Sequence, residues 1–483
     1  MIRPFLVLAA ALVSVSSAGP LPAADPQKPN IVFILADDLG YTDVACFGSR
    51  YYETPNIDRL AAQGVKLRNH HHCQNCTPTR AALMSGQYGP RTGVYTVGGT
   101  DRFDTSERPL IPVENVQALP LDRKTIAQQL KTAGYATGMF GKWHLSEKGE
   151  HHPARRGFDE AIVSAGQHFD FKTNPPTEYP EGQYLADFLT DKAVDFIGRN
   201  KDAPFFLYLP HFGVHAPHQA KPELIAKFKD KPPVGGHHDP TYAAMIASVD
   251  ESVGRVLKSL EDLKLADNTV VIFATDNGGV GGYSREGIKK GAGEITDNAP
   301  LRSGKGSLYE GGTRVPFIVR WPGVVTAGTS VDVPTIHVDL FPTLLAIGGA
   351  PAPEQKLDGE SLVPVLKDSS ARLKREAIYQ HFPGYLGAGP GFWRTTPVTL
   401  IHEGDWKLME FLEDGRLELY NLRDDLGESK NLAESQPEKA AQLLAKLKAW
   451  RAEVAAPMPE RKTASDSTEP PARKKPKKKK QAA

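Results

Sequence analysis

The chain has 483 residues, of which 40% are hydrophobic and 24% are charged. These fractions are ordinary for a soluble globular protein, and the length allows a large core and more than one domain. The 58 basic residues nearly balance the 57 acids, but seven of them lie at 473–480, so the remaining chain is mildly acidic. This charge distribution argues against a protein whose body binds nucleic acid.

Residues 1–24 are predicted to be a signal peptide. Arg3 supplies a positive charge, residues 5–15 are apolar but too short to cross a membrane comfortably, and small residues follow up to Ala24. No later stretch is long and apolar enough for a membrane span. The sequence therefore predicts an exported protein, periplasmic or secreted.

Several short apolar runs end abruptly in polar residues, as buried strands of an α/β sheet do. Helical stretches are expected between them, at 125–133 and 242–260. The predicted fold is α/β, with a large mixed β-sheet sandwiched by helices, and in such sheets ligands bind beyond the carboxyl ends of the strands. The runs and the polar residues that follow them are 31–36 before Asp37 and Asp38, 139–140 before Lys142 and His144, 205–209 before His211, His215 and His218, and 270–274 before Asp276 and Asn277.

The chain has three cysteines, and two of them, Cys73 and Cys76, stand as C-x-x-C. A zinc site would need more cysteines or a spaced histidine pair, and a redox pair would have its first cysteine at a helix start. Here Cys76 occupies that place, with Pro78 just inside the helix. A helix N-terminus favours a nucleophile or an anion site. A plain buried cysteine stays open from this stretch alone.

The polar strand ends combine acids with cations. Three carboxylates and an amide, from Asp37, Asp38, Asp276 and Asn277, form an oxygen-rich set that suits a hard divalent cation. Lysines and histidines at other strand ends would surround an anion, so a phosphate or sulfate ester is the expected substrate. Each motif alone has a plainer interpretation, because Asp-Asp often caps a helix and Asp-Asn-Gly-Gly often forms a turn.

Taken together, the motifs resemble those of the type I, formylglycine-dependent sulfatases of the alkaline-phosphatase-like superfamily. The resemblance runs from Pro29 to about Ala433. Thr79 stands where the family more often has serine. The matching segments are Cys76-Thr-Pro-Thr-Arg80 with Leu83, Ser85 and Gly86; Gly134–His144; Thr54–Asp58; Pro300–Lys305; and Glu310–Pro316.

The resemblance implies that Cys76 is oxidised to formylglycine (3-oxoalanine) by a formylglycine-generating maturation enzyme. It also implies one Ca²⁺ per chain, held by Asp37, Asp38, Asp276, Asn277 and the hydrated residue 76. One hydroxyl of that residue would attack sulfur and expel the alcohol, and loss of a proton from the other would release sulfate. Cys73 is then expected to be an incidental small buried side chain.

Further roles carry over residue by residue. Arg80, one helical turn after Cys76, would hold residue 76 and the metal-site carboxylates. Lys142 and Lys305 would bind the sulfate oxygens, and His144 would act as the base that releases sulfate. His215 best matches the acid that protonates the leaving group, with His211 and His218 as competitors.

Domain boundaries are predicted from composition and pattern. Residues 25–375 would form the sulfatase catalytic domain, and 376–456 a smaller C-terminal α+β subdomain. Its expected elements are strands at 377–382, 406–411 and 417–422 and a helix at 437–454, joined by a glycine-rich loop at 384–391. Residues 457–483 are predicted to be a disordered basic tail.

The predicted function is hydrolysis of sulfate monoesters on a sulfated poly- or oligosaccharide, with aryl sulfates as surrogate substrates. Tyr385, Phe392 and Trp393 could stack on sugar rings. One alternative is a phosphoester or phosphonate hydrolase of the same superfamily. The other is a non-catalytic binder of sulfated glycans. The pairs His151-His152 and His237-His238 are expected to be surface loops or substrate contacts.

Overall fold

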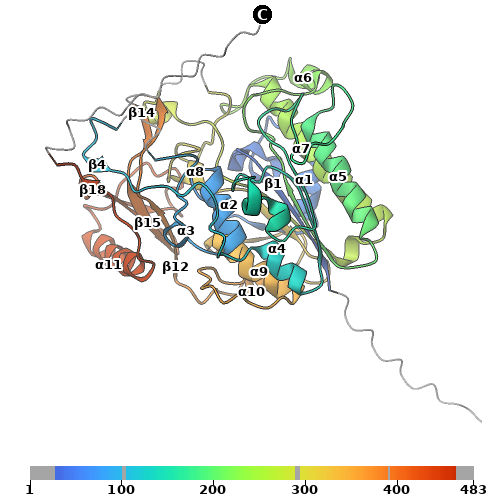
Figure 1. The fold of residues 1–483 in the computed structure, drawn as a ribbon. Coiled ribbons are helices and arrows are strands. Elements are labelled where there is room, and N and C mark those ends of the chain that lie inside the picture. Colours follow the sequence, from blue (N-terminus) through green and yellow to red (C-terminus); the bar gives the residue numbers. More distant parts are fainter. Residues whose placement is uncertain (1–27, 101–104, 289–293, 390–391, 464–483) are drawn as a thin grey trace, which may run out of the picture.

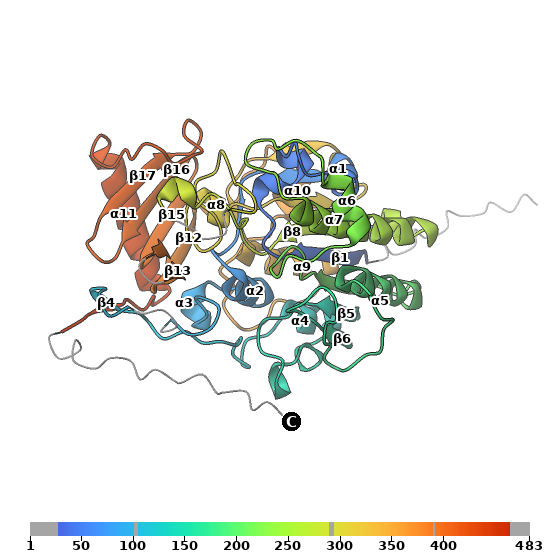
Figure 2. The ribbon, with the colours of Figure 1, turned by 90° about the horizontal axis from the view of Figure 1, so that it is seen from above.

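A computed structural model describes residues 28–100, 105–288, 294–389 and 392–463. The predicted signal peptide and residues 464–483 of the predicted basic tail lie outside the described residues. Figures 1 and 2 show two units side by side, a larger helix-flanked sheet and a smaller unit built from the C-terminal strands.

The larger unit is organised around an eight-stranded sheet. Its strand order is β10-β2-β9-β8-β1-β7-β5-β6, and β9 is antiparallel to both its neighbours while the other pairs are parallel. This mixed sheet confirms the predicted fold class. The strands are β1 (Asn30–Ala36), β2 (Val65–Leu67), β5 (Ala136–Gly141), β6 (Glu160–Val163), β7 (Phe205–Pro210), β8 (Thr269–Thr275), β9 (Phe317–Arg320) and β10 (Thr329–Val331).

Helices cover both faces of this sheet because its central strands are apolar on both sides. In β1, Val32 and Ile34 pack into one core cluster, whereas Ile31 and Phe33 pack into the other, as the alternation of side chains along a strand requires. One face carries α1 (Pro55–Ala62), α5 (Leu185–Arg199), α6 (Pro222–Phe228) and α7 (Pro240–Asp262); the other carries α2 (Cys76–Ser85), α4 (Ile126–Thr132), α9 (Leu340–Gly348) and α10 (Val363–Lys367).

The smaller unit is a four-stranded antiparallel sheet covered by one helix. Its strands run in the order β12 (Ala377–Phe382), β15 (Val398–Glu403), β16 (Trp406–Phe411), β17 (Leu417–Asn421). Helix α11 (Pro437–Glu453) packs Leu443, Leu447 and Trp450 against this sheet. Three of these strands match the predicted ones, and β15 is a further strand that was not predicted.

Two predictions about the C-terminal region were wrong. The glycine-rich segment 384–391 is not only a loop, because Leu386–Gly389 (β13) pairs with Phe392–Thr395 (β14) in a hairpin. The tail does not start at residue 457, because Glu460–Arg461 (β18) pairs with Leu110–Ile111 (β4). In both cases backbone hydrogen bonds to a partner strand order a segment whose composition looked irregular.

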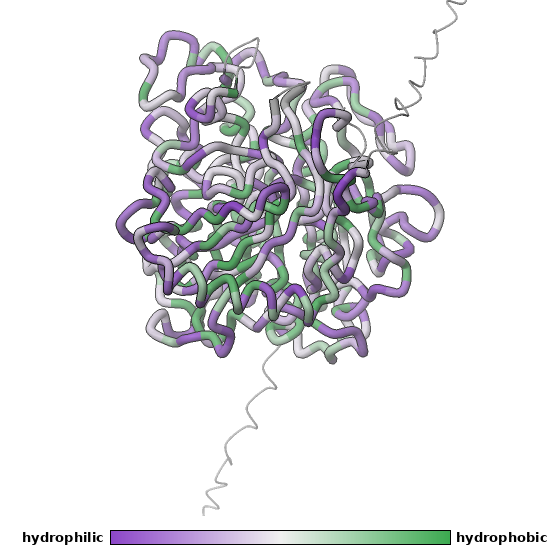
Figure 3. Tube along the Cα trace, turned by 90° about the vertical axis from the view of Figure 1, so that its left-hand side faces the viewer, coloured by the Kyte–Doolittle hydropathy of each residue, from purple (hydrophilic) through white to green (hydrophobic). Residues whose placement is uncertain are grey.

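Short elements join the two units. Thr335–Ile336 (β11) pairs with His70–His71 (β3), and α3 (Gly89–Thr92) and α8 (Glu310–Thr313) lie between the two sheets. Hydrophobic residues gather toward the centre of the molecule and hydrophilic ones at its periphery (Figure 3). Within the described ranges, none of the helices has the length and apolar character needed to cross a membrane.

Candidate active site

The candidate site begins where the two central strands end. β1 and β8 are parallel neighbours, and their last residues, Ala36 and Thr275, are partners in register. The next residues are therefore also side by side: Asp37 and Asp38 after β1, and Asp276 and Asn277 after β8. All four are buried, with at most 2% of their surface exposed. The register of β1 and β8 therefore brings these four predicted residues together.

Hydrogen bonds link the two strand ends. Asn277 Nδ2 donates to Asp38 Oδ1 over 2.9 Å, and the Asp38 backbone N–H donates to Asp276 Oδ1 over 3.3 Å. Asn277 Oδ1 is buried and has no hydrogen-bond partner among the described residues. A buried acceptor without a partner is costly unless a cation or water binds it. The carboxylates and this amide oxygen therefore fit a hard divalent cation.

Cys76 is the first residue of α2 and points at this carboxylate group. Its Sγ lies 3.5 Å from Asp37 Oδ1. One donor atom each from Asp37, Asp38, Cys76 and His215 lies within 4.8 Å of the others, a spacing suited to a metal ion. Burial, followed by the nearby Asp276, raises the pKa of the Cys76 thiol above its ordinary value, so the helix N-terminus does not make it a thiolate.

The C-x-x-C pair is not a disulfide, because all three cysteines are free. The expectation that Cys73 is buried was wrong, because it is only half-buried, with its Sγ 3.5 Å from His337 Nε2. Cys76 and Cys73 therefore have separate surroundings, since only Cys76 faces the carboxylates.

Three cations face the three carboxylates. Arg80 Nη2 lies 2.7 Å from Asp276 Oδ2, Lys142 Nζ lies 2.5 Å from Asp37 Oδ2, and Lys305 Nζ lies 2.7 Å from Asp38. Arg80 Nη1 also donates to the Lys142 carbonyl over 2.5 Å. Each buried charge in these pairs needs its partner of opposite sign, because an unpaired buried charge costs several kcal/mol. The lysines predicted to bind an anion thus lie directly at the site.

The pairing decides how the carboxyl groups ionise. Burial opposes ionisation of Asp37, but Lys142, followed by His215 and Arg80, holds its pKa below the ordinary range. Lys305 and His215 do the same for Asp38 against its burial. The pKa of Asp276 is instead raised, by burial and then by the negative charge of Asp37. A bound divalent cation would relieve this last effect.

Of the three candidate histidines, His215 faces the carboxylates. Its Nε2 lies 3.7 Å from Asp38 Oδ2, and its Nδ1 bonds the Ala216 carbonyl over 2.6 Å. His211 is fully buried, and its Nε2 bonds Ser252 Oγ over 2.9 Å. His218 packs edge-on against Tyr242. The choice of His215 over its competitors thus agrees with the geometry.

His144 follows β5 in a left-handed backbone conformation, with φ of 60°. Its Nδ1 is buried and has no hydrogen-bond partner among the described residues. Burial, followed by the positive charges of Lys142 and Arg80, lowers its pKa to about 2. The ring is therefore neutral.

Sequence reasoning missed two residues that pack beside His215. Phe212 stacks on the His215 ring, and the buried His168 lies behind Phe212. His168 follows β6, so its position after a strand was the available signal. His237 was expected to be in a surface loop or to contact substrate; the first alternative is wrong, because His237 is buried and stacks on Tyr52.

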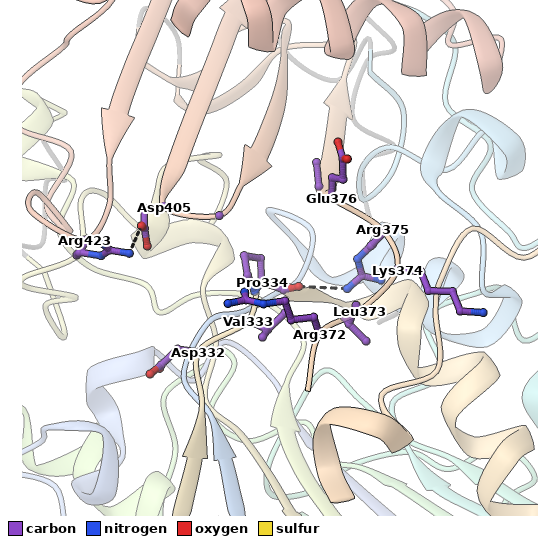
Figure 4. A pocket seen from close by; sticks show the side chains of 12 residues that line it. Asp332, Val333, Pro334, Arg372, Leu373, Lys374, Arg375, Glu376, Asp405 and Arg423 are labelled. Carbon is purple, nitrogen blue, oxygen red and sulfur yellow. Dashed lines mark hydrogen bonds and ion pairs between the residues drawn. The ribbon is translucent and has the colours of Figure 1, made fainter. Parts of the chain in front are cut away.

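A surface cavity of about 490 Å³ lies away from this site, between the two units (Figure 4). None of the catalytic candidates lines it. Arg423 pairs with Asp405, and Arg375 donates to the Pro334 carbonyl, so much of its polar lining is already satisfied. The cavity does not belong to the candidate active site.

The sulfatase family model matches residues 29–350, more than half of the chain. The chain belongs to the sulfatase family. A second model, described as N-sulphoglucosamine sulphohydrolase, C-terminal, matches residues 304–455. The protein is therefore an enzyme that hydrolyses sulfate esters, and the prediction of a sulfatase is confirmed.

Individual relatives cover most of this sulfatase. A sulfatase of Formosa agariphila is 36% identical over 507 residues, which cover 88% of this chain and 89% of that protein. Human N-acetylgalactosamine-6-sulfatase is 34% identical over 366 residues, which cover 71% and 66%. The crystal structure of Ps i-CgsB in complex with k-i-k-neocarrahexaose is 30% identical, with a TM-score of 0.74 and coverage of 91% and 96%.

Proposed function

We propose that this sulfatase desulfates a sulfated poly- or oligosaccharide through a formylglycine made from Cys76, with one Ca²⁺ as cofactor. Asp37, Asp38, Asp276 and Asn277 would hold the ion. The proposal extends to export to the periplasm or the exterior and to maturation by a formylglycine-generating enzyme. A saccharide substrate is proposed because one similar protein is named N-acetylgalactosamine-6-sulfatase and a similar crystal structure is a complex with k-i-k-neocarrahexaose.

The observation that carries the proposal is the position of Cys76. Its sulfur lies within 4.8 Å of donor atoms from Asp37, Asp38 and His215, and Lys142 and Lys305 border the same group. An oxygen attached to the same carbon would lie between metal ligands and anion-binding cations. When bound, Ca²⁺ would balance the carboxylates and make a hydroxyl group of residue 76 easier to ionise.

The other side chains have roles that follow from their geometry. Lys142 and Lys305 would neutralise the sulfate oxygens, and Arg80 fixes both Asp276 and the Lys142 backbone. His215, with Nδ1–H donated to the Ala216 carbonyl, would deliver a proton from Nε2 to the leaving oxygen. The neutral His144 would accept the proton whose removal from residue 76 releases sulfate.

Mass spectrometry of residue 76 tests this proposal. A tryptic peptide containing residue 76, from protein produced with a formylglycine-generating enzyme, should carry an aldehyde instead of the thiol. Activity should rise in proportion to the aldehyde fraction. Full activity in protein that contains only the thiol would contradict the proposal.

Paired substrates test the phosphate alternative. 4-Nitrophenyl sulfate and 4-nitrophenyl phosphate have the same leaving group, so their ratio of kcat/KM reports the transferred group alone. The proposal predicts a clear preference for the sulfate. A preference for the phosphate would favour the phosphoester hydrolase.

A further inference from the structure

Four aromatic rings form a continuous stack that ends at the candidate acid. The Tyr184 and His168 rings are 5.7 Å apart, the His168 and Phe212 rings 4.8 Å, and the Phe212 and His215 rings 5.0 Å. Each pair is close to parallel, at 16°, 26° and 29°. Stacked rings restrict each other's tilt, so this stack limits how the His215 imidazole can turn.

A hydrogen bond ties the same residues together. His168 Nε2 lies 2.8 Å from the His215 backbone carbonyl. A carbonyl can only accept, so Nε2 carries the proton and donates it. Burial lowers the pKa of His168 to about 4, so the ring is neutral near pH 7 and remains in this tautomer.

His168 is itself held firmly. Its side chain is buried, its backbone N–H donates to Gln219 Oε1 over 3.1 Å, and its carbonyl accepts from the Leu185 N–H over 2.8 Å. The Tyr184 hydroxyl donates to the Gln219 carbonyl over 2.9 Å. These bonds join the segment after β6 and Tyr184 to Gln219, at the end of the 211–219 loop. His168 is thus held in place and is bonded to the loop at His215 and Gln219.

One ring of the stack, that of Phe212, also lies near Lys142, which is proposed to bind the sulfate oxygens. Lys142 Nζ lies 5.6 Å from the centre of the Phe212 ring while pairing with Asp37. His215 is less enclosed, with 30% of its side chain exposed. An exposed histidine on a loop would sample several orientations unless neighbouring groups fixed it.

We propose that His168 is a positioning residue for His215, holding its carbonyl by the Nε2–H bond and its ring through Phe212. This inference rests on the proposed function, in which His215 protonates the leaving group. The His168 Nε2–H donates to the His215 carbonyl and not to a carboxylate or to residue 76, so its effect on catalysis would pass through His215.

The test compares two substitutions that separate the ring from the donor. His168→Phe keeps a ring for the stack but has no donor, whereas His168→Gln keeps an N–H donor near the position of Nε2 and loses the ring. Two substrates are used, 4-nitrophenyl sulfate and phenyl sulfate. Phenol is the poorer leaving group, so phenyl sulfate depends more on a proton from the acid.

The expected result is a loss that depends on the leaving group. His168→Phe should lower kcat for phenyl sulfate about tenfold and kcat for 4-nitrophenyl sulfate by less than about threefold. His168→Gln should restore most of the activity on phenyl sulfate. An equal loss on both substrates, or no loss on either, would overturn the proposal.

A matched control histidine lies in the other unit. His381 is also buried, its Nε2 bonds the Pro457 carbonyl over 2.9 Å, and its pKa is likewise lowered to about 4 by burial. His381→Phe should leave the ratio of the two kcat values unchanged. A change in that ratio as large as that for His168→Phe would show a general effect of losing a buried histidine, and would overturn the proposal.

Two further measurements separate this inference from the proposed function. His215→Ala should lower kcat for phenyl sulfate more than for 4-nitrophenyl sulfate, and an equal loss would reject His215 as the acid. A crystal structure of His168→Phe tests positioning directly. We expect a displaced or multiply oriented His215 ring, and an unmoved, ordered ring would reject the role of His168 whatever the acid is.

Discussion

Lys407, in strand β16 of the C-terminal sheet, lies 2.9 Å from Glu310, the first residue of α8 in the segment that also carries Lys305. Lys407 Nζ also lies 2.8 Å from Glu428 and 2.8 Å from the Leu308 carbonyl. All three side chains are buried. One cation from the smaller unit therefore compensates two carboxylates and holds the segment that delivers a lysine to the active site.

Removing this cation should weaken both stability and activity. Lys407→Met leaves Glu310 and Glu428 facing each other without their shared partner, and breaking a buried ion pair costs about 3–5 kcal/mol. We expect a large fall in the unfolding temperature. Measured at pH 8, above the pKa of Glu428, the double variant Lys407→Met/Glu428→Gln should recover part of this loss, since one carboxylate is then neutral. No recovery at pH 8 would contradict the compensation of both carboxylates by Lys407.

Glu428 should make stability depend on pH. Burial, and then the nearby Glu310, raises its pKa from 4.5 to about 7 despite Lys407. Between these values the folded state retains a proton that the unfolded state releases, so this contribution to stability falls as pH rises from about 4.5 through about 7. Glu428→Gln cannot ionise, so its unfolding temperature should rise relative to wild type between pH 5 and pH 8. A difference in unfolding temperature between the variant and wild type that stays constant over this pH range would contradict the raised pKa of Glu428.

The proposed metal site can be tested by removing one ligand. Asp37→Ala should abolish bound Ca²⁺ and activity, because Asp37 is buried beside Cys76 and Lys142, and should leave the fold intact. Elemental analysis and circular dichroism measure these outcomes. Asp424→Ala, at an exposed acid of the C-terminal unit, is the control and should retain the metal. Full activity in verified metal-free protein would reject the site.

Cys76→Ser tests the need for an aldehyde. Hydrated formylglycine has two hydroxyl groups, one to attack sulfur and one to expel sulfate, whereas serine has only one. We expect no sustained turnover and a slowly accumulating adduct with the mass of one sulfuryl group on residue 76. Intact-protein mass spectrometry detects it. Multiple turnovers by protein confirmed to contain serine would show that the aldehyde is unnecessary.

The sequence by itself determined the elements that depend on local pattern. The apolar run of β1 followed by Asp37 and Asp38 predicted a buried strand with acids at its carboxyl end, and β8 did the same for Asp276 and Asn277. The strand period and the turn residues are local properties, so these elements could be found without knowing their neighbours. The motif around Cys76 also indicated the family and its catalytic chemistry.

Only the tertiary structure decided which of these groups meet. The parallel register of β1 and β8 puts Asp38 beside Asn277, and the path of the loop after β7 turns His215, and not His211, toward the carboxylates. The roles of His168 and Lys407 could not be predicted, because they depend on contacts with segments far apart in the chain. Packing and backbone pairing select these contacts as the chain folds, whereas the local sequence pattern indicates only which residues can form each element.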